Sequence, residues 1–227
     1  MKPWKFVAIV SLLGGACSQS ESRPAAEPPR VRVNAALPPP PVAEAPPPSA
    51  RPLEEAPKTP DVVYVPTPQP VVDRMLALAE VKKSDLVYDL GCGDGRIVVT
   101  AAKRYGARAV GFDVDPARVA EARQNVADNG LEDLVTIEQK DIFTLDLRPA
   151  SVITLYLLPE LNVKLIPQLE KLRPDSRIVS HDFDMAGIKP RVHLTMRPPG
   201  TDREHQVYLW HTPLQRDDSQ ATRAKAP

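Results

Sequence analysis

Residues 89–95 read Asp-Leu-Gly-Cys-Gly-Asp-Gly, and the fold predicted for this chain follows from that stretch. It comes after a short apolar run at 86–90, which is typical of a buried strand, and before the helical pattern of residues 96–105. Its G-x-G-x-G spacing differs from the G-x-G-x-x-G of dinucleotide-binding loops, and it lets the backbone pass close to a ligand without an intervening Cβ. We therefore expect a ligand-binding turn between a strand and a helix.

Strand and helix patterns alternate on both sides of this turn. Such alternation predicts an α/β fold with a mostly parallel seven-stranded sheet, helices on both faces, and ligands bound beyond the carboxyl ends of the strands. The last two strands have no helix between them and are expected to pair in antiparallel fashion. The expected helices lie at 69–81, 96–105, 116–129 and 160–172, and the expected strands at 86–90, 109–113, 135–138, 151–156, 177–180, 192–196 and 206–210.

Acidic residues follow three successive strands of this predicted sheet. Asp89 and Asp94 flank the glycine turn, where they would repel a pyrophosphate and attract a ligand that carries an ammonium and a sulfonium. S-adenosylmethionine carries both groups. Asp113 ends the second strand, where it can accept both ribose hydroxyls, while Asp141 can accept from the adenine amino group and Ile142 can pack on the ring. Each acid alone could be an ordinary helix cap, but three in order are hard to explain as caps.

These residues give the chain a resemblance to a known family. Residues 61–212 resemble class I S-adenosylmethionine-dependent methyltransferases, and DLGCGDG at 89–95 is similar to their motif I. The resemblance implies a Rossmann-like fold and S-adenosyl-L-methionine as the cofactor. The cofactor contacts expected from the charge pattern and the resemblance are Tyr64, Thr67, Asp89, Gly91, Gly93, Asp94, Asp113, Val114, Asp141 and Ile142.

A narrower resemblance covers three stretches of the chain. YVPTP at 64–68, DLGCGDGRIVV at 89–99 and ITLYLLPELNVKLIPQLEKL at 153–172 look like a small family of protein-lysine methyltransferases. Its mitochondrial members modify the c subunit of ATP synthase and the adenine nucleotide translocase, and it has bacterial relatives. The chain departs from the family in having Cys92 where those members carry a serine, and in a shorter acidic pattern at 112–115. The resemblance implies a protein substrate methylated on a lysine side chain.

Two residues near the end of the fourth strand are candidates for the catalytic side of the site. Tyr156 stands where this family places its acceptor pocket, and Glu160 follows it closely. The alternatives are that Tyr156 only packs at the sheet edge and that Glu160 only favours a helix N-terminus. Tyr64 and Thr67 could cover the cofactor from the front. The run His-Asp-Phe-Asp at 181–184 is interpreted as a loop or as lining of the acceptor pocket, and no metal site is expected there.

Composition and motifs argue against other classes of protein. Lysine plus arginine and aspartate plus glutamate each number 29, so the chain lacks the basic excess of a nucleic-acid binder. After the fourth strand it also lacks the [D/N]-P-P-[Y/F] element expected of an amino-methylating DNA enzyme. Two cysteines, Cys17 and Cys92, provide no disulfide framework and no zinc cluster.

The N-terminal quarter has the composition of an export signal and a tether. Residues 1–17 contain two lysines, an apolar run at 6–13 and small residues before Cys17, so they resemble a signal peptide with an imperfect lipobox. The 27 prolines are concentrated between Pro24 and Pro70, so residues 18–60 are expected to form a disordered linker. Residues 61–215 form the predicted methyltransferase domain, and 216–227 a disordered tail.

The sequence therefore predicts a monomeric S-adenosylmethionine-dependent methyltransferase that acts on a protein lysine, without nucleic acid or metal. Its N-terminus predicts an exported or membrane-tethered protein, on the periplasmic side, with a lipid on Cys17, ordinary signal cleavage near Ala16 or an uncleaved apolar anchor. The cytoplasmic face stays open, because S-adenosylmethionine is made in the cytosol. Two alternatives also stay open: a small-molecule O- or N-methyltransferase, and a non-catalytic cofactor-binding module on an exported lipoprotein.

Overall fold

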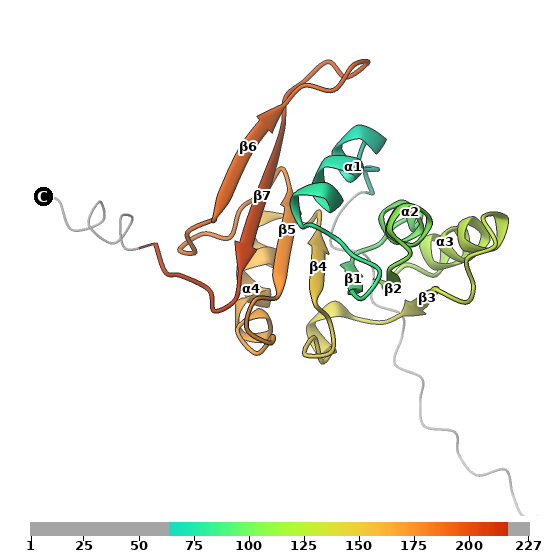
Figure 1. Ribbon diagram of the computed structural model, residues 1–227, viewed down its shortest axis with the longest axis horizontal. Coiled ribbons are helices and arrows are strands. Elements are labelled where there is room, and N and C mark those ends of the chain that lie inside the picture. The colour runs from blue at the N-terminus through green and yellow to red at the C-terminus, as the bar shows by residue number, and fades with distance from the viewer. Residues whose placement is uncertain (1–63, 218–227) are drawn as a thin grey trace, which may run out of the picture. The chain divides into compact units, whose positions relative to one another are not determined.

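The computed structural model describes residues 64–217, in which helices and strands alternate along the chain (Figure 1). The order of the elements agrees with the sequence prediction. The helices are α1 (Gln69–Leu78), α2 (Arg96–Tyr105), α3 (Pro116–Asp128), the short 3-10 helix η1 (Ile142–Thr144) and α4 (Pro159–Leu169). The strands are β1 (Leu86–Leu90), β2 (Arg108–Asp113), β3 (Val135–Gln139), β4 (Val152–Leu155), β5 (Arg177–His181), β6 (Val192–Met196) and β7 (His205–His211).

The strands form one seven-stranded sheet in the order β3-β2-β1-β4-β5-β7-β6. The first five strands of the chain run parallel, whereas β7 is antiparallel to both β5 and β6. The predicted mostly parallel sheet with an antiparallel closing pair is therefore confirmed. β7 lies between β5 and β6, so the loop that joins β6 to β7 returns beside the carboxyl end of β5.

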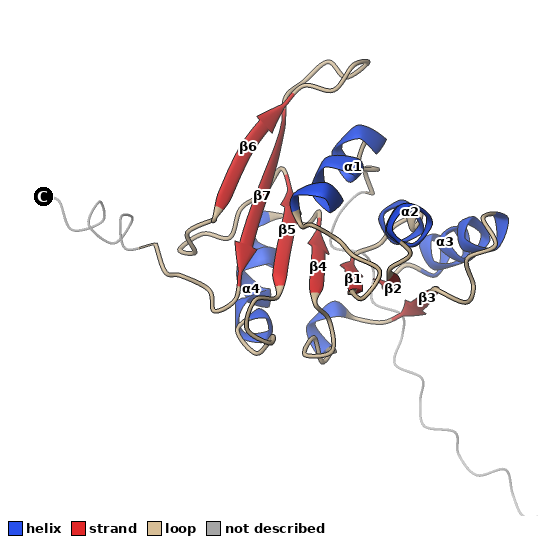
Figure 2. Ribbon diagram, in the orientation of Figure 1, coloured by secondary structure: helices blue, strands red, loops and turns tan. Residues whose placement is uncertain are grey.

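Helices cover both faces of the sheet, as predicted (Figure 2). Neighbouring side chains of a strand point to opposite faces. In β4, Val152 packs with α1, α2 and α3, whereas Ile153 packs in a second cluster with α4 and η1. The largest fully buried side chain, Trp210 of β7, belongs to the second cluster. All four residues of β4 are buried, so this central strand is largely apolar on both faces.

Two predicted helices end earlier than expected. α1 ends at Leu78 instead of 81, because Ala79 caps it and Glu80 takes a left-handed backbone with φ of 47°. α4 begins at Pro159 and ends at Leu169 instead of 172. Pro167, expected as a kink, is accommodated within α4. These differences move no strand, so they do not alter the position of the site.

The predicted ends of the chain lie mostly outside the described residues. The expected signal segment at 1–17 and the linker at 18–60 precede residue 64, and most of the expected tail follows residue 217. Arg216, placed in that tail by the sequence prediction, instead forms a β-bridge with Ile188. None of the helices between residues 64 and 217 has the length and apolar character needed to cross a membrane.

Candidate functional site

The carboxyl ends of the parallel strands meet at one edge of the sheet and border a cavity of about 640 Å³. This is the edge at which doubly wound sheets bind ligands. Many of the residues named from the sequence line the cavity, and further residues extend it toward α3 and α4. The predicted residues are Tyr64, Thr67, Asp89, Gly91, Asp94, Asp113, Val114, Asp141, Ile142 and Tyr156, and the further ones include Val65, Arg96, Ile97, Asp115, Arg118, Phe143, Leu157, Leu158, Leu161 and Lys164.

Asp89, in β1, places a buried carboxylate at the cavity. Its side chain is only 2% exposed, and Oδ1 accepts a hydrogen bond of 2.6 Å from the hydroxyl of Thr154. None of residues 64–217 donates to Oδ2. Burial raises the pKa of Asp89 to about 7, although the Thr154 hydroxyl opposes that rise. A buried carboxylate with an unused oxygen favours a cationic ligand, because a cation would offset the cost of desolvation.

Asp113, at the end of β2, holds the glycine loop. Its Oδ2 accepts from the backbone NH of Gly93 at 2.9 Å, and Oδ1 accepts from the NH of Asp115 at 3.0 Å. Asp115 in turn caps α3 by accepting from the NH of Ala117. Asp113 therefore joins two loops and still lines the cavity, so its position fits a contact with ribose hydroxyls.

After β3, Asp141 and Ile142 form the far wall of the cavity. The side chain of Asp141 accepts from the NH of Phe143 at 3.0 Å and so begins η1. Ile142 is buried and packs in the second cluster, on the face of the sheet that α4 covers. Asp141 is thus both a helix cap and a wall of the site, two roles that sequence reasoning treats as alternatives.

The expectation that Asp94 contributes a free negative charge is not met. The Nε of Arg96 donates to Asp94 Oδ1 at 2.9 Å, and a second nitrogen of the guanidinium pairs with Oδ2. Burial would raise the pKa of Asp94, but the hydrogen bonds from Arg96 outweigh it and lower the pKa. Arg96 begins α2 only two residues after Asp94, so the acid is neutralised before any ligand arrives. The attraction of a cationic ligand therefore depends mainly on Asp89.

Residues 64–68 form a strap that crosses the glycine loop. The Tyr64 ring lies over Gly93, so close that a Cβ at Gly93 would stand 2.1 Å from a ring carbon. This covering explains why Gly93, although predicted as a contact, does not line the cavity. The guanidinium of Arg96 donates to the carbonyl of Thr67 at 2.8 Å. The hydroxyl of Thr67 lies 3.1 Å from Nδ1 of His181, which anchors the other side of the strap.

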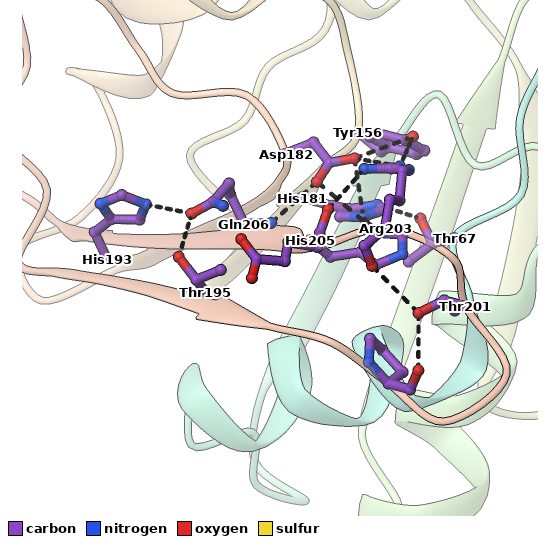
Figure 3. Close-up of polar contacts among 12 residues, drawn as sticks. Thr67, Tyr156, His181, Asp182, His193, Thr195, Thr201, Arg203, His205 and Gln206 are labelled. Atoms are coloured by element: carbon purple, nitrogen blue, oxygen red, sulfur yellow. Dashed lines mark hydrogen bonds and ion pairs between the residues drawn. The ribbon is translucent and has the colours of Figure 1, made fainter.

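The acceptor side of the cavity is aromatic and apolar. The ring of Tyr156, after β4, is tilted by 37° to that of His181 at a centroid distance of 4.0 Å and is stacked on that of Phe183 at 6.1 Å. Its hydroxyl donates to Asp182 Oδ2 at 3.4 Å (Figure 3). Burial raises the pKa of Tyr156, so its phenol stays neutral. Phe183 joins Tyr156 in the lining.

Glu160 is not brought to this site. Its side chain is exposed in the first turn of α4, and it is not among the residues that line the cavity. A negative charge there is favourable to the helix N-terminus. The structure therefore agrees with the second interpretation of Glu160 and gives no support to a catalytic role.

Sequence reasoning missed the groups that the β6–β7 hairpin brings to the acceptor side. His205 Nδ1 lies 2.8 Å from Nε2 of His181, and Arg203 pairs with Asp182 at 2.6 Å (Figure 3). The expected loop at 181–184 is thus the centre of a polar network. The potential metal ligands of His181, Asp182 and His205 lie within 4.8 Å of one another. Both ring nitrogens of His181 already have partners, and a guanidinium holds the carboxylate, so this set is a hydrogen-bonded network.

Cys92 is a buried residue of the glycine loop, and burial raises the pKa of its thiol. It acts as a packing residue, since a thiol that stays protonated is a poor nucleophile.

Comparisons with known proteins agree with this site. A family profile described as "ANTKMT methyltransferase domain" matches residues 89–192. A protein-lysine N-methyltransferase of Saccharolobus islandicus is 43% identical over 153 residues, which cover 66% of this chain and 94% of the relative. The human lysine N-methyltransferase named for the C subunit of ATP synthase is 27% identical over 121 residues, 53% of this chain and about half (51%) of that protein.

A solved structure leads to the same cofactor. The crystal structure of an RNA methyltransferase from Salinibacter ruber, in complex with S-adenosyl-L-homocysteine, is 49% identical and superimposes with a TM-score of 0.61. The alignment covers 68% of this chain and 97% of that one. The buried, unpaired oxygen of Asp89 and the carboxylates of Asp113 and Asp141 fit the sulfonium, ammonium, ribose and adenine of S-adenosylmethionine. The chain is a methyltransferase that uses this cofactor, and it belongs to the same family as the Saccharolobus protein-lysine N-methyltransferase.

Proposed function

We propose that this methyltransferase acts on the side-chain amine of lysine in a protein substrate. The observation that carries the proposal is the aromatic acceptor wall, where Tyr156 and Phe183 line the cavity and the carboxylate of Asp182 lies against the Tyr156 hydroxyl. Asp182 is not itself among the residues that line the cavity and lies behind the Tyr156 hydroxyl, so an aromatic wall backed by a negative charge suits an alkyl chain that ends in an amine. The names of the Saccharolobus and human relatives, which both refer to lysine, support the same acceptor.

The chemistry required of the chain is positioning and exclusion of water. When bound, S-adenosylmethionine would supply an electrophilic methyl group to a neutral amine, with loss of the methyl–sulfur bond, to give S-adenosylhomocysteine and a methylated ammonium. The ammonium of the free lysine first gives one proton to solvent. The strap at 64–68 closes one side of the cavity, and Leu157 and Leu158 close another with apolar surface. Alignment of the amine with the methyl group supplies most of the acceleration.

The decisive experiment offers the purified full chain two classes of acceptor. Proteins of the native host and its total RNA are incubated separately with S-adenosylmethionine labelled in the methyl group. A matched protein sample has its lysines acetylated beforehand. We expect label in the protein sample, loss of that label after acetylation, and a 14-dalton increment on lysine by mass spectrometry. The variant Asp113→Ala controls for transfer by contaminating enzymes, because it weakens the cofactor site.

RNA is the second candidate acceptor, because the similar Salinibacter protein is described as an RNA methyltransferase. The balance of 29 basic and 29 acidic residues argues against it, since RNA binding draws on a basic surface. Label in RNA that survives treatment with protease, with none on protein lysine, would replace the lysine proposal. Label only on small molecules of a cell extract would favour the small-molecule alternative.

We further propose that residues 1–17 export the chain or tether it to a membrane, a proposal that rests on the sequence alone. A topology reporter fused after residue 217 and a Cys17→Ser variant would test it. An active periplasmic reporter and a Cys17-dependent membrane fraction are the expected results. A cytoplasmic reporter signal would refute export and would also remove the question of how the cofactor reaches the far side. A monomer is expected, and light scattering would check it.

A further inference from the structure

We infer that Asp182 binds the ammonium group of the acceptor before methyl transfer, and that Arg203 occupies this place when no acceptor is bound. This inference rests on the proposed amine acceptor and goes beyond it by naming the residue that recognises the cation. It also makes Arg203 an internal competitor of the acceptor. Figure 3 shows Asp182, Tyr156 and Arg203 facing one another at the end of β5.

The backbone fixes the carboxylate of Asp182 beside the acceptor wall. Asp182 follows β5 with φ of +61°, a left-handed conformation that is uncommon for a residue with a Cβ. Its NH donates to the carbonyl of Gln206 at 2.8 Å, and its Oδ1 accepts from the NH of Gln206 at 3.0 Å. The NH of Phe183 donates to the carbonyl of His181 at 2.8 Å, which closes a tight turn around Asp182. The side chain is 10% exposed, and the hydrogen bond from Gln206 orients its carboxylate.

The remaining oxygen of Asp182, Oδ2, lies behind Tyr156, because Asp182 does not itself line the cavity, and this oxygen binds a cation. Arg203 Nη2 lies 2.6 Å from Asp182 Oδ2 and 3.4 Å from the hydroxyl of Tyr156, and that hydroxyl lies 3.4 Å from the same Oδ2. One nitrogen of the guanidinium is thus placed between the carboxylate and the phenol that lines the acceptor side. A lysine ammonium that entered along Tyr156 would need the same two oxygens.

Arg203 reaches this place from outside. It belongs to the hairpin loop between β6 and β7, and its side chain is 52% exposed, whereas that of Asp182 is 10% exposed. An exposed guanidinium can return to water at small cost, because half of its surface is already hydrated. The carboxylate of Asp182 is largely shielded from water and cannot be rehydrated in this way. Displacement of Arg203 by another cation is therefore easier than removal of the charge from Asp182.

The other groups around Asp182 do not replace that cation. His181 Nε2 lies 3.3 Å from Oδ2, and His205 Nδ1 lies 3.9 Å from Oδ1. Burial lowers the pKa of His181 to about 4 and also lowers the pKa of His205, so both rings are neutral near pH 7. Among residues 64–217, Arg203 is then the one full positive charge in ion-pair contact with Asp182. Without Arg203 the buried carboxylate would favour any other cation that fits.

The protonation state of the Asp182 carboxyl group agrees with a role in binding a cation. Burial raises its pKa, but hydrogen bonds from Arg203 and the Gln206 backbone outweigh that effect and hold the pKa below its ordinary value. An ammonium that replaces Arg203 supplies the same kind of charge-assisted contact, so the carboxylate binds it without taking its proton, and the proton passes to solvent before the lone pair attacks the methyl group. Asp182 positions the nitrogen next to Tyr156, and the chemistry stays that of the proposed function.

The test uses steady-state kinetics on the full chain with a lysine-containing acceptor peptide. We expect Asp182→Asn to raise the acceptor KM by about tenfold or more, because a charge-assisted contact is lost. Arg203→Gln should lower that KM by about threefold or more, because the competitor is removed. The double variant should behave like Asp182→Asn. Affinity for S-adenosylhomocysteine, measured by calorimetry, should change less than about twofold in all three.

Arg197→Gln is the matched control. Arg197 lies on the same hairpin loop, pairs with Glu204 and is 64% exposed, but it does not contact Asp182. Its replacement should leave the acceptor KM unchanged. If Arg203→Gln instead raises the KM together with Asp182→Asn, Arg203 is a structural clamp on the hairpin and the inference is overturned. Addition of zinc or of a chelator should have no effect on the wild-type rate, whereas a rate that follows the zinc concentration would mean that His181, Asp182 and His205 bind a metal ion.

A second measurement separates this inference from the choice of lysine as acceptor. Butylammonium, a minimal lysine side chain, is titrated into the protein with S-adenosylhomocysteine bound and followed by NMR. Binding should tighten in Arg203→Gln and vanish in Asp182→Asn. Equal binding by all variants refutes the subsite even if lysine is methylated. The expected pattern without transfer to any lysine refutes the proposed acceptor but leaves the cation subsite in place.

Discussion

The hydroxyl of Thr67 lies 3.1 Å from Nδ1 of His181, and both side chains are buried, although the two residues are 114 positions apart in the sequence. This contact joins the strap over the glycine loop to the end of β5. The same histidine contacts His205 through its other ring nitrogen and lies against the ring of Tyr156 in a tilted arrangement. The cofactor side and the acceptor side of the cavity are therefore connected through a single neutral ring.

Replacement of Thr67 should weaken cofactor binding by loosening the strap. Thr67→Val keeps the shape and removes the hydroxyl, which should cost about 1 kcal/mol, or roughly a fivefold rise in the Kd for S-adenosylmethionine. Isothermal calorimetry would measure the change. Thr195→Val is the control, because its hydroxyl bonds to Gln206 on an exposed face of the hairpin. An unchanged Kd for Thr67→Val would show that the strap does not depend on this contact.

Asp113→Ala should weaken the binding of S-adenosylmethionine by about 1–3 kcal/mol, because it removes the proposed ribose contact and a support of the glycine loop. Calorimetry on the purified chain gives the affinity, and circular dichroism checks that the variant is folded. Asp128→Ala is a matched control, since Asp128 is exposed near the end of α3 and bonds only to Gln124 among the contacts of the described residues. Equal losses in both variants would argue against the ribose assignment.

Affinity for the cationic cofactor should rise with pH around neutrality. Asp89 has a pKa of about 7 in the cofactor-free protein, so it is mostly neutral at pH 6 and mostly ionised at pH 8. The ionised form attracts the positive charges of S-adenosylmethionine, so the Kd should fall across this range. S-adenosylhomocysteine, which lacks the sulfonium charge, should respond less. Asp89→Asn should flatten the dependence, and a dependence that persists in this variant would assign it to another group.

Mild acid should destabilise the fold through His181. Burial lowers its pKa in the folded state to about 4, compared with an ordinary value of 6.5. The unfolded chain therefore binds more protons between these values, and stability falls as pH decreases through this window. Thermal melts between pH 7 and pH 4 would show the decline in Tm. The decline should be smaller in His181→Gln and unchanged in His193→Gln, whose ring is exposed on β6; equal curves for all three would place the acid sensitivity elsewhere.

Local pattern is enough to predict the parallel part of the sheet and the cofactor side of the site. Asp89 and Asp113 lie in the last two positions of β1 and β2, and Asp141 follows β3, and the carboxyl ends of parallel strands meet at one edge whatever the details of packing. Their common position therefore needs only the order of strands and helices. The free charge expected of Asp94 is absent for a local reason: Arg96, two residues further on, neutralises it.

The acceptor side could be decided only by the tertiary structure. Thr67, Arg203 and His205 have no periodic pattern that relates them to β5, and Glu160 is close to Tyr156 in sequence but is exposed on α4. The insertion of β7 between β5 and β6 brings the hairpin residues to Asp182. Strand periodicity specifies which side chains face each side of a sheet, but it leaves open which strand is the neighbour, because that choice depends on packing between segments far apart in the chain.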